Sequence, residues 1–400
     1  MNGHITKQLP ETPTAAEPTA RPLRVLFAGG GTGGHLSPAL AVAQTLRRQS
    51  PTAEILFIGT ADRLEATKVP AAGFAFRAIS VHGLAGKWSL RDLGKRLRGV
   101  LELVSALPLW QALGIIRRFN PDVVVGTGGY VCGPVLFAAW LANRPALLVE
   151  QNEVIGHTSR LVTGFIRLAA VISEASGAFF RARGLRTEVV GNPVRPAVVD
   201  TTRADAVSTL GLDPARLTLA VVGGSLGSSP INAALVGAVP RLANEAWFRD
   251  GWQVIHITGP TRGGGLSANE THTLGFPYQA YPFLDNIHDV LAASDMVITR
   301  AGGTFLAEIA ARGVPMIIIP GSWPADDHQT RNAQPFHDAG AAIVITDAAL
   351  SPDRLFTALQ EVLPDADHRA TMAAACRALG HPDAARRIVS FVEELAVARR

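Results

Sequence analysis

Short apolar runs of strand length alternate with turns and with longer amphipathic segments along most of the chain. This alternation predicts βαβ units assembled into doubly wound parallel sheets. The runs that we interpret as strands are residues 23–28, 55–58, 75–79, 123–125, 146–149, 170–173 and 188–190, followed by 217–222, 253–257, 278–281, 296–299, 316–319 and 342–345.

The strand series starts twice, at Leu23 and at Leu217, and a glycine turn and a helix follow both starts (a helix near 38–49 after the first). Gly191-Asn192-Pro193-Val194 separates the two series and has the composition of a hinge. We therefore predict an α/β protein with two Rossmann-like doubly wound domains facing across a cleft. A helix near 383–398 could pack in either domain, and we expect it on the first. The predicted parts are a disordered tail (1–22), an N-terminal domain (23–190), a C-terminal domain (191–378) and a C-terminal helix (379–400).

The composition is that of a soluble globular protein long enough for about two domains. Of its 400 residues 48% are hydrophobic and 18% charged, and the net charge of +4 is too small to indicate nucleic-acid binding. Cys132 and Cys376 have no metal-ligand spacing and are predicted to be small buried residues of a cytosolic protein. The uncharged segment 123–143 is long enough to span a membrane, but its glycines and Pro134 predict a strand, a turn and a helix instead.

Four glycine-rich turns follow predicted strands, at residues 29–34, 126–129, 223–227 and 302–304. The first contains a G-x-G-x-x-G match, but the acidic residue that dinucleotide binding requires on the next strand is missing. A helix that begins at such a turn directs free N–H groups and its positive dipole end at an anion. Four turns in two domains predict a cleft that binds two diphosphate ligands.

The fourth turn lies in the most informative segment, residues 300–320. A buried strand precedes it, and Leu306, Ile309 and Ala310 share one face of the helix that follows. Gly313 is expected to end that helix. Glu308, about one helical turn in, could turn back toward a sugar hydroxyl. The alternative is an ordinary strand, turn and helix with a glutamate on the surface.

In six ordered motifs the chain resembles the MurG family of glycosyltransferases, from Leu23 to the C-terminus. The motifs are Gly30-Gly31-Thr32-Gly33-Gly34-His35, Gly128-Gly129-Tyr130-Val131-Cys132-Gly133-Pro134, Glu150-Gln151-Asn152, Gly191-Asn192-Pro193-Val194-Arg195, Gly223-Gly224-Ser225, and Arg300-Ala301-Gly302 through Glu308. The sequence departs from the family at Val149, Leu226 and His328, which affects details of sugar contact.

This resemblance implies a GT-B fold and inverting transfer of N-acetylglucosamine from UDP-N-acetylglucosamine. The implied acceptor is undecaprenyl-diphosphate-linked N-acetylmuramyl-pentapeptide, so lipid I becomes lipid II in peptidoglycan synthesis. Helix ends and cations, without a metal ion or cofactor, would offset the charge of the departing UDP. The alternatives are a relative with another lipid acceptor, such as a diacylglycerol galactosyltransferase, a UDP-sugar epimerase, and a non-catalytic nucleotide-sugar-binding module.

The resemblance also implies roles for individual residues. On the donor side it implies Arg195 and Ser225 at the nucleotide, Leu284 beside the uracil, Glu308 at the ribose, Thr304 and Gln329 at the diphosphate and the sugar, Asn152 at the sugar from the opposite wall, and Thr32, Gly33 and Gly34 in the first turn. On the acceptor side it implies Gly31, Thr127, Gly128, Gly129 and Tyr130. His35 is the candidate general base, since imidazole exchanges a proton near neutral pH. Alternatively it orients its loop or binds an acceptor phosphate, because a positive helix end makes a ring less basic.

The lipid of the implied acceptor stays in the membrane, so we expect the N-terminal domain to bind an anionic membrane surface from the cytoplasmic side. Basic residues beside exposed apolar ones are typical of an interfacial anchor. The alternative is a solvated helix packed on its own sheet. The candidate anchor consists of Lys87, Arg91, Lys95, Arg96 and Arg98, followed by Leu101, Leu103, Val104, Leu107, Leu109, Trp110 and Leu113.

Overall fold

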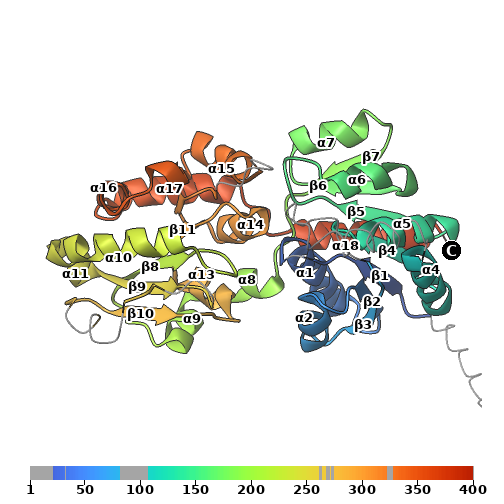
Figure 1. The fold of residues 1–400 in the computed structure, drawn as a ribbon, viewed down its shortest axis with the longest axis horizontal. Helices are drawn as coiled ribbons and strands as arrows, with labels where there is room; N and C mark the ends of the chain where they lie inside the picture. Colours follow the sequence, from blue (N-terminus) through green and yellow to red (C-terminus); the bar gives the residue numbers. More distant parts are fainter. Residues whose placement is uncertain are drawn as a thin grey trace, which may run out of the picture.

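Two parallel β-sheets, one in each half of the chain, organise the computed structural model (Figure 1). The structure describes residues 21–31, 33–81, 107–260, 264–266, 271, 274–321 and 328–399. Within them the strand order is β3-β2-β1-β4-β5-β6-β7 in the N-terminal sheet and β10-β9-β8-β11-β12-β13 in the C-terminal sheet. Both orders run outward from a central pair of strands, as in a Rossmann fold. The prediction of two doubly wound domains is confirmed.

The strands of the two sheets have the following bounds. In the N-terminal sheet they are β1 (Arg24–Ala28), β2 (Glu54–Gly59), β3 (Ala75–Ala78), β4 (Val123–Gly126), β5 (Ala146–Val149), β6 (Leu168–Val171) and β7 (Arg186–Val189). In the C-terminal sheet they are β8 (Leu217–Val222), β9 (Trp252–Ile257), β10 (Tyr278–Tyr281), β11 (Met296–Thr299), β12 (Met316–Ile318) and β13 (Ala342–Val344).

The helices connect these strands and cover both faces of each sheet. The N-terminal domain contains α1 (Gly33–Gln49), α2 (Glu65–Ala71), α4 (Leu107–Phe119), α5 (Cys132–Leu141), α6 (His157–Val162), η2 (Thr163–Phe165) and α7 (Glu174–Arg181). The second half contains α8 (Pro196–Asp200), α9 (Arg203–Leu210), α10 (Ser229–Asn244), α11 (Ala246–Gly251), α13 (Ile287–Ala293), α14 (Gly303–Arg312), α15 (His328–Asp338), η3 (Asp347–Ala349), α16 (Pro352–Val362), α17 (Ala366–Ala378) and α18 (Ala384–Val397).

Alternating strand residues divide each domain's core between the two faces of its sheet. In β1, Val25 and Phe27 belong to the cluster that includes α1, whereas Leu26 and Ala28 belong to the cluster that includes α4 and α5. The last helix, α18, contacts α1 and adds Ile388 to the first of these clusters. The chain therefore returns to the N-terminal domain after completing the C-terminal one, as the red helix in Figure 1 shows.

The predicted elements differ from the observed ones in two informative places. The apolar run predicted a strand at 170–173, but β6 begins two residues earlier, because Leu168 is already buried in the sheet. The first helix was expected near Pro38, but α1 begins at Gly33, so Pro38 is its sixth residue. Proline has no N–H, and in a helix that N–H would bond to the carbonyl four residues earlier. The Gly34 carbonyl therefore lacks its usual partner within α1.

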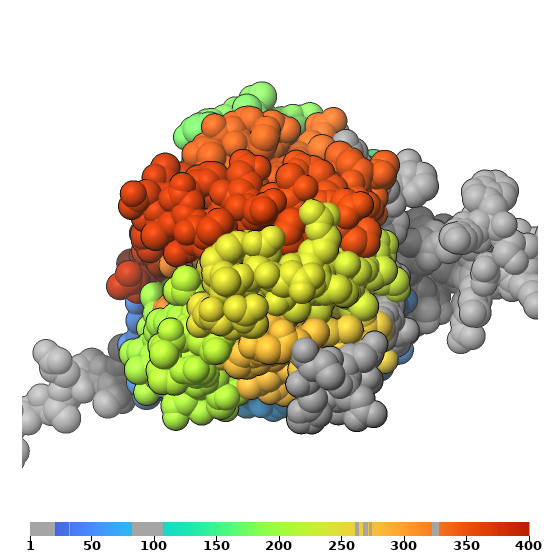
Figure 2. All heavy atoms as spheres, turned by 90° about the vertical axis from the view of Figure 1, so that its left-hand side faces the viewer, coloured from blue at the N-terminus to red at the C-terminus, as the bar shows by residue number. Residues whose placement is uncertain are grey.

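The two domains lie side by side along the long axis of the molecule. Seen from the side of the C-terminal domain, α16 and α17 lie above the yellow region of α10, and this domain hides most of the other one (Figure 2). Residues 123–143 form β4, a turn and α5, which confirms the prediction for that segment. Among the described residues no helix is both long enough and apolar enough to cross a bilayer. The predicted basic segment 87–98, with Leu101, Leu103 and Val104, and residues 1–20 of the predicted tail lie outside the described residues.

Candidate active site between the two domains

All four glycine turns follow strands at the topological switch points of the two sheets. β1 pairs with β4, and the turns at 29–34 and 126–129 leave these neighbouring strands. β8 pairs with β11, and the turns at 223–227 and 302–304 leave that pair. Since the carboxyl ends of paired parallel strands lie at one edge, each domain places two glycine turns next to each other. This edge is where open α/β sheets bind ligands.

A buried carboxylate that the sequence analysis missed holds the first glycine turn. Glu65, the first residue of α2, is 1% exposed and accepts a hydrogen bond from the Gly31 N–H (3.1 Å). Its other oxygen accepts from the N–H and hydroxyl of Thr60 (3.0 and 2.9 Å). The N–H of Gly31 is thus bonded within the protein and is not free to bind an anion. In the sequence, the one indication of Glu65 was that the second strand lacks the acidic residue expected at its end.

The second glycine turn interlocks with the first through His35. The Thr127 hydroxyl donates to the His35 carbonyl oxygen (2.8 Å). Gly128 and Gly129 have φ values of +92° and +79°, a region that favours glycine. A Cβ on Gly128 would also lie 2.8 Å from His35 Nδ1, and one on Gly129 would lie 2.5 Å from the Gly30 carbonyl oxygen. Both glycines are therefore required for the imidazole to lie against this turn.

The His35 ring also contacts the loop that follows β5. His35 Nδ1 lies 3.0 Å from Gln151 Oε1. The Gln151 side-chain NH₂ group donates to the carbonyl oxygens of Thr127 (2.8 Å) and Val149 (2.6 Å). Gln151 belongs to the Glu-Gln-Asn motif, in which the sequence pointed only to a role for Asn152.

The carboxylate of Glu150 binds the backbone of the same loop, and this loop faces the other domain. Its Oε1 accepts from the backbone N–H groups of Gln151 (3.1 Å) and Asn152 (3.2 Å). A Cβ on Gly303, the first residue of α14, would lie 2.9 Å from the Gln151 carbonyl oxygen and 3.7 Å from Asn152 Oδ1. Only glycine allows this approach, so the fourth turn is in direct contact with the N-terminal domain.

The N-termini of α1 and α14 meet across the domain boundary. The Thr304 hydroxyl donates to the Gly34 carbonyl oxygen (3.3 Å), the group that Pro38 leaves without a helical partner. On the C-terminal side, Gln329 Oε1 accepts from the N–H groups of Ala301 (3.2 Å) and Gly321 (2.8 Å). With its oxygen used in this way, Gln329 directs its NH₂ group elsewhere, and that group has no hydrogen-bond partner among the described residues.

Glu308 lies deeper in the C-terminal domain than predicted and is paired with Arg195. It is the sixth residue of α14, in the second turn rather than about one turn in, and it is 3% exposed. The alternative of a surface glutamate is therefore wrong. Arg195 Nε and Nη2 donate to its two oxygens at 2.8 and 3.1 Å, a bidentate arrangement. Arg195 and Glu308, the two side chains predicted to contact the nucleotide, thus bind each other in this structure.

The third glycine turn is tied to the fourth by Arg300. Its Nη2 donates to the hydroxyl of Ser228 (2.7 Å), which in turn caps α10, and its Nη1 donates to the Ile319 carbonyl oxygen (3.1 Å). Arg300 therefore supports the turns and does not extend freely over them. Ser225 is exposed in the third turn.

The remaining predicted residues lie around this contact or outside it. Tyr130 is exposed beside the second turn, next to Gly129. Leu284 is half-buried after β10, two strands away from the β8–β11 switch point. Thr32 lies outside the described residues. The structure thus places Gly34, Asn152 and Thr304 at the domain contact. Beside it lie, in the N-terminal domain, Gly31, Gly33, His35, Thr127, Gly128 and Gly129 and, in the C-terminal domain, Arg195, Ser225, Glu308 and Gln329, with Leu284 farther out.

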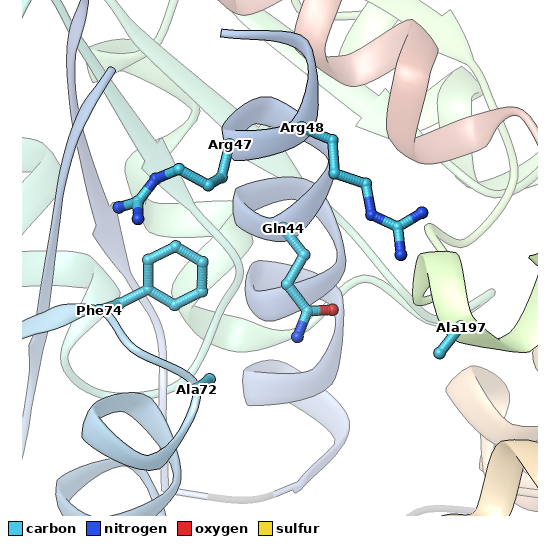
Figure 3. Close-up of a pocket in the computed structure, with 6 residues that line it drawn as sticks. All are labelled: Gln44, Arg47, Arg48, Ala72, Phe74 and Ala197. Atoms are coloured by element: carbon cyan, nitrogen blue, oxygen red, sulfur yellow. The ribbon is translucent and has the colours of Figure 1, made fainter. Parts of the chain in front are cut away.

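A separate cavity of about 280 Å³ lies along the C-terminal half of α1, away from the glycine turns (Figure 3). It is lined by Gln44, Arg47, Arg48, Ala72, Phe74 and Ala197. The Arg47 guanidinium lies over the Phe74 ring (5.2 Å), and Arg48 pairs with Asp200 of the C-terminal half. Both cations of this cavity already have partners, and none of the predicted site residues lines it.

Neither cysteine has the properties of a nucleophile. Burial raises the pKa of the Cys132 thiol to about 12 and that of Cys376 to about 12 as well. Both are buried, as predicted. In the part of the chain that the structure describes, no three His, Cys, Asp or Glu side chains are placed to hold a metal ion.

Comparison with known proteins identifies relatives over nearly the whole length. Residues 25–171 match the glycosyltransferase family 28 N-terminal domain, and residues 218–388 match its C-terminal domain. A protein of Desulforamulus reducens named UDP-N-acetylglucosamine–N-acetylmuramyl-(pentapeptide) pyrophosphoryl-undecaprenol N-acetylglucosamine transferase is 38% identical over 382 residues, covering 93% of this chain and 99% of the relative. The protein of that name from Desulfitobacterium hafniense is 39% identical over 376 residues, with 92% and 98% coverage.

Solved structures with the same fold include enzymes of more than one activity. The crystal structure of Acinetobacter baumannii MurG superposes with a TM-score of 0.70 at 25% identity and covers 93% of this chain and 100% of that one. A putative UDP-N-acetylglucosamine 2-epimerase of Listeria monocytogenes gives 0.64 at 14% identity, with 93% and 96% coverage. The second likeness concerns the fold alone.

Proposed function

The chain belongs to glycosyltransferase family 28, and from this membership we propose that it transfers N-acetylglucosamine, with inversion, from UDP-N-acetylglucosamine to the 4-hydroxyl of undecaprenyl-diphosphate-linked N-acetylmuramyl-pentapeptide. The enzyme thereby converts lipid I into lipid II in peptidoglycan synthesis. Relatives that bear the name of this activity align with almost the entire chain at 38–39% identity.

The observation that carries this proposal is the meeting of α1 and α14 at their N-termini, joined by the Thr304 hydroxyl and the Gly34 carbonyl. Each helix begins at a glycine turn and belongs to a different domain. Glycosyl transfer requires the donor and the acceptor to be held against each other, and helix ends on opposite walls could hold their diphosphates in that way. The imidazole of His35 lies at this contact.

On the donor side, the free N–H groups at the start of α14 and the NH₂ group of Gln329 would bind the UDP diphosphate and stabilise its charge on departure. Glu308 would accept the ribose hydroxyls while Arg195 holds its carboxylate in place. An ionised carboxylate has about four lone-pair sites, so the bidentate arginine leaves room for a sugar hydroxyl. On the acceptor side, His35 would remove the proton of the attacking hydroxyl.

The test is transfer of label from radiolabelled UDP-N-acetylglucosamine to a short-chain lipid I analogue, with and without EDTA. We expect a labelled lipid II analogue, dependent on the acceptor. A donor converted to its 2-epimer without acceptor would instead favour the epimerase alternative, which shares the fold. Transfer to a diacylglycerol in preference to the lipid I analogue would favour the other lipid-acceptor alternative.

The enzyme would work at the cytoplasmic face of the membrane as a peripheral protein. Support comes from exposed apolar side chains on α4, α5 and α6, which pack side by side in the N-terminal domain. These side chains are Leu107, Trp110, Trp140, Leu141 and Leu161, with exposed fractions from 45% to 78%. The predicted basic segment, residues 87–98, ends nine positions before Leu107 in the sequence, and the combination is typical of interfacial binding.

Vesicle co-sedimentation tests this membrane proposal. A Trp110→Ser/Trp140→Ser variant should bind phosphatidylglycerol vesicles less than the wild type, yet retain transfer to a soluble short-chain acceptor. Val397→Ser removes an even more exposed apolar side chain (72%) from α18 and serves as the control. Lys95→Glu/Arg98→Glu tests the basic segment, where each charge contributes about 1 kcal/mol near the surface and is screened by salt. Equal binding by all variants at low salt would refute the proposal.

A further inference from the structure

The hydrogen bonds around Gln151 determine which nitrogen of His35 carries the proton. Both hydrogens of the Gln151 amide are used by carbonyl oxygens, those of Thr127 at 2.8 Å and Val149 at 2.6 Å. The opposite orientation of the amide would place its oxygen against these two oxygens, so the network admits only one orientation. The atom 3.0 Å from His35 Nδ1 is therefore an amide oxygen, which can only accept.

His35 must then donate from Nδ1. In a neutral imidazole one nitrogen is a donor and the other carries a lone pair, so Nε2 is left as the basic atom. Within the described residues no hydrogen bond to Nε2 is present, and the ring is only partly buried. Nε2 is thus the nitrogen free to take a proton from a substrate.

Gln151 also connects this ring to the other domain. Its side chain holds His35 while its backbone carbonyl lies against Gly303, where a Cβ would approach to 2.9 Å. Gln151 is 3% exposed, and its own N–H donates to the buried Glu150 (3.1 Å), so the loop is held from both sides. The residue that orients the imidazole therefore lies directly against the helix start that would bind the donor diphosphate.

From this arrangement we propose that Gln151 is a positioning residue for the transfer reaction: it holds His35 in the Nδ1–H tautomer and directs Nε2 toward the acceptor hydroxyl. The inference rests on the proposed function. In the step itself, Nε2 takes the hydroxyl proton, the acceptor oxygen forms a bond to the anomeric carbon, and the bond from that carbon to UDP breaks, with its electron pair leaving on the diphosphate. Because the partner is a neutral amide, it sets the tautomer without adding a charge beside the ring.

The tautomer can be measured without any turnover. The full-length protein labelled with ¹⁵N-histidine, with His35 identified by loss of its signals in His35→Gln, should show a protonated Nδ1 and an unprotonated Nε2 at neutral pH. A wild-type spectrum with the proton on Nε2 would overturn the proposal.

Kinetics then test whether the tautomer serves the reaction. Gln151→Met keeps the length of the side chain but removes the acceptor and both donors. We expect a mixture of His35 tautomers and a kcat lower by at least about tenfold, less than the roughly 10²–10⁴-fold of a complete general-base contribution because the imidazole itself is retained. The KM for UDP-N-acetylglucosamine should change by no more than about twofold, because the lost effect lies in the transition state.

The matched control is Gln253→Met in β9. Gln253 is an equally buried glutamine whose NH₂ group donates to the Asp213 carbonyl (2.9 Å) and to the Thr218 hydroxyl (3.2 Å), in the other domain. It should destabilise the fold comparably and leave the His35 signals and kcat near wild type. A changed tautomer with unchanged kcat in Gln151→Met would overturn the proposed role. Absence of transfer by the wild type would refute the proposed function instead, while its spectrum would still report the tautomer.

Discussion

Replacement of Glu308 by alanine separates donor binding from the stability of the fold. The carboxylate has two functions in our account: it accepts both hydrogen bonds of the Arg195 fork, and it would accept the ribose hydroxyls of the donor. Glu308→Ala removes both at once. The variant should therefore bind UDP-N-acetylglucosamine more weakly and also unfold at a lower denaturant concentration.

The structure indicates the size of each effect. Loss of hydrogen bonds from a charged acceptor to the ribose should cost about 1–3 kcal/mol of binding free energy, a factor of roughly 5 to 150 in affinity. Breaking a fully buried ion pair costs about 3–5 kcal/mol, whereas an exposed pair contributes about 0–1 kcal/mol. The Glu308 side chain is 4% exposed but that of Arg195 is 24% exposed, so water can reach the remaining guanidinium. We therefore expect a loss of about 2 kcal/mol in the free energy of unfolding, between these limits.

Calorimetric titration with UDP and with 2′-deoxy-UDP makes the assay specific for the ribose. The wild type should prefer UDP, and Glu308→Ala should lose most of that preference. Asp295→Ala is the control, since it breaks another partly buried pair in the same domain, with Arg203 at 2.8 Å, and should destabilise the protein without changing donor affinity. A folded Glu308→Ala variant that still discriminates between the two nucleotides would refute the assignment of Glu308 to the ribose.

Three further outcomes are expected. Burial lowers the pKa of His256 to about 4, so the folded state resists the protonation that the unfolded state accepts near pH 6.5. The free energy of unfolding of the wild type should therefore fall as the pH drops from 6.5 to 4, by up to about 3 kcal/mol more than that of His256→Phe, and urea unfolding at each pH measures this difference. Gly303→Ala places a methyl group 2.9 Å from the Gln151 carbonyl oxygen and should push the two domains apart at this point. We expect kcat to fall by about tenfold or more while the Tm changes little, and unchanged kinetics would contradict a role for this contact in the reaction. Turnover should survive exhaustive chelation, because helix N-termini offset the diphosphate charge; a loss restored by added magnesium would contradict this mechanism.

The fold could be predicted from the sequence because each of its signals is local. Buried parallel strands are short apolar runs, and glycine turns mark where they end, so the strand series and the four turns emerge without tertiary information. The start of β7 was predicted two residues late, and its residues Arg186–Val189 are mostly polar and only half-buried at the sheet edge. An edge strand has less apolar surface to bury and so leaves a weaker pattern.

The site could be predicted only in part, because its supporting contacts join residues far apart in sequence. Glu65 binds the turn at Gly31 over 34 positions, and Gln151 binds His35 over 116. A buried acid or amide at the start of a helix or in a loop has no periodic signature. Arg195 and Glu308 could each be related to the nucleotide by resemblance, but their pairing, over 113 positions, depends on the packing of α8 against α14.

Pro38 shows how a local irregularity can serve the contact between the domains. A proline at the sixth position of a helix removes a hydrogen bond and leaves a carbonyl without its partner, which is unfavourable in an isolated helix. Here that carbonyl, on Gly34, accepts the hydroxyl of Thr304 from the opposite domain. The bond from α14 thus offsets part of the cost within α1. The same proline that displaced the predicted start of α1 therefore favours the arrangement in which both glycine-initiated helices face one another. Departures from sequence rules are most often found at functional sites, and this proline lies between the two helix N-termini that are proposed to bind the diphosphates.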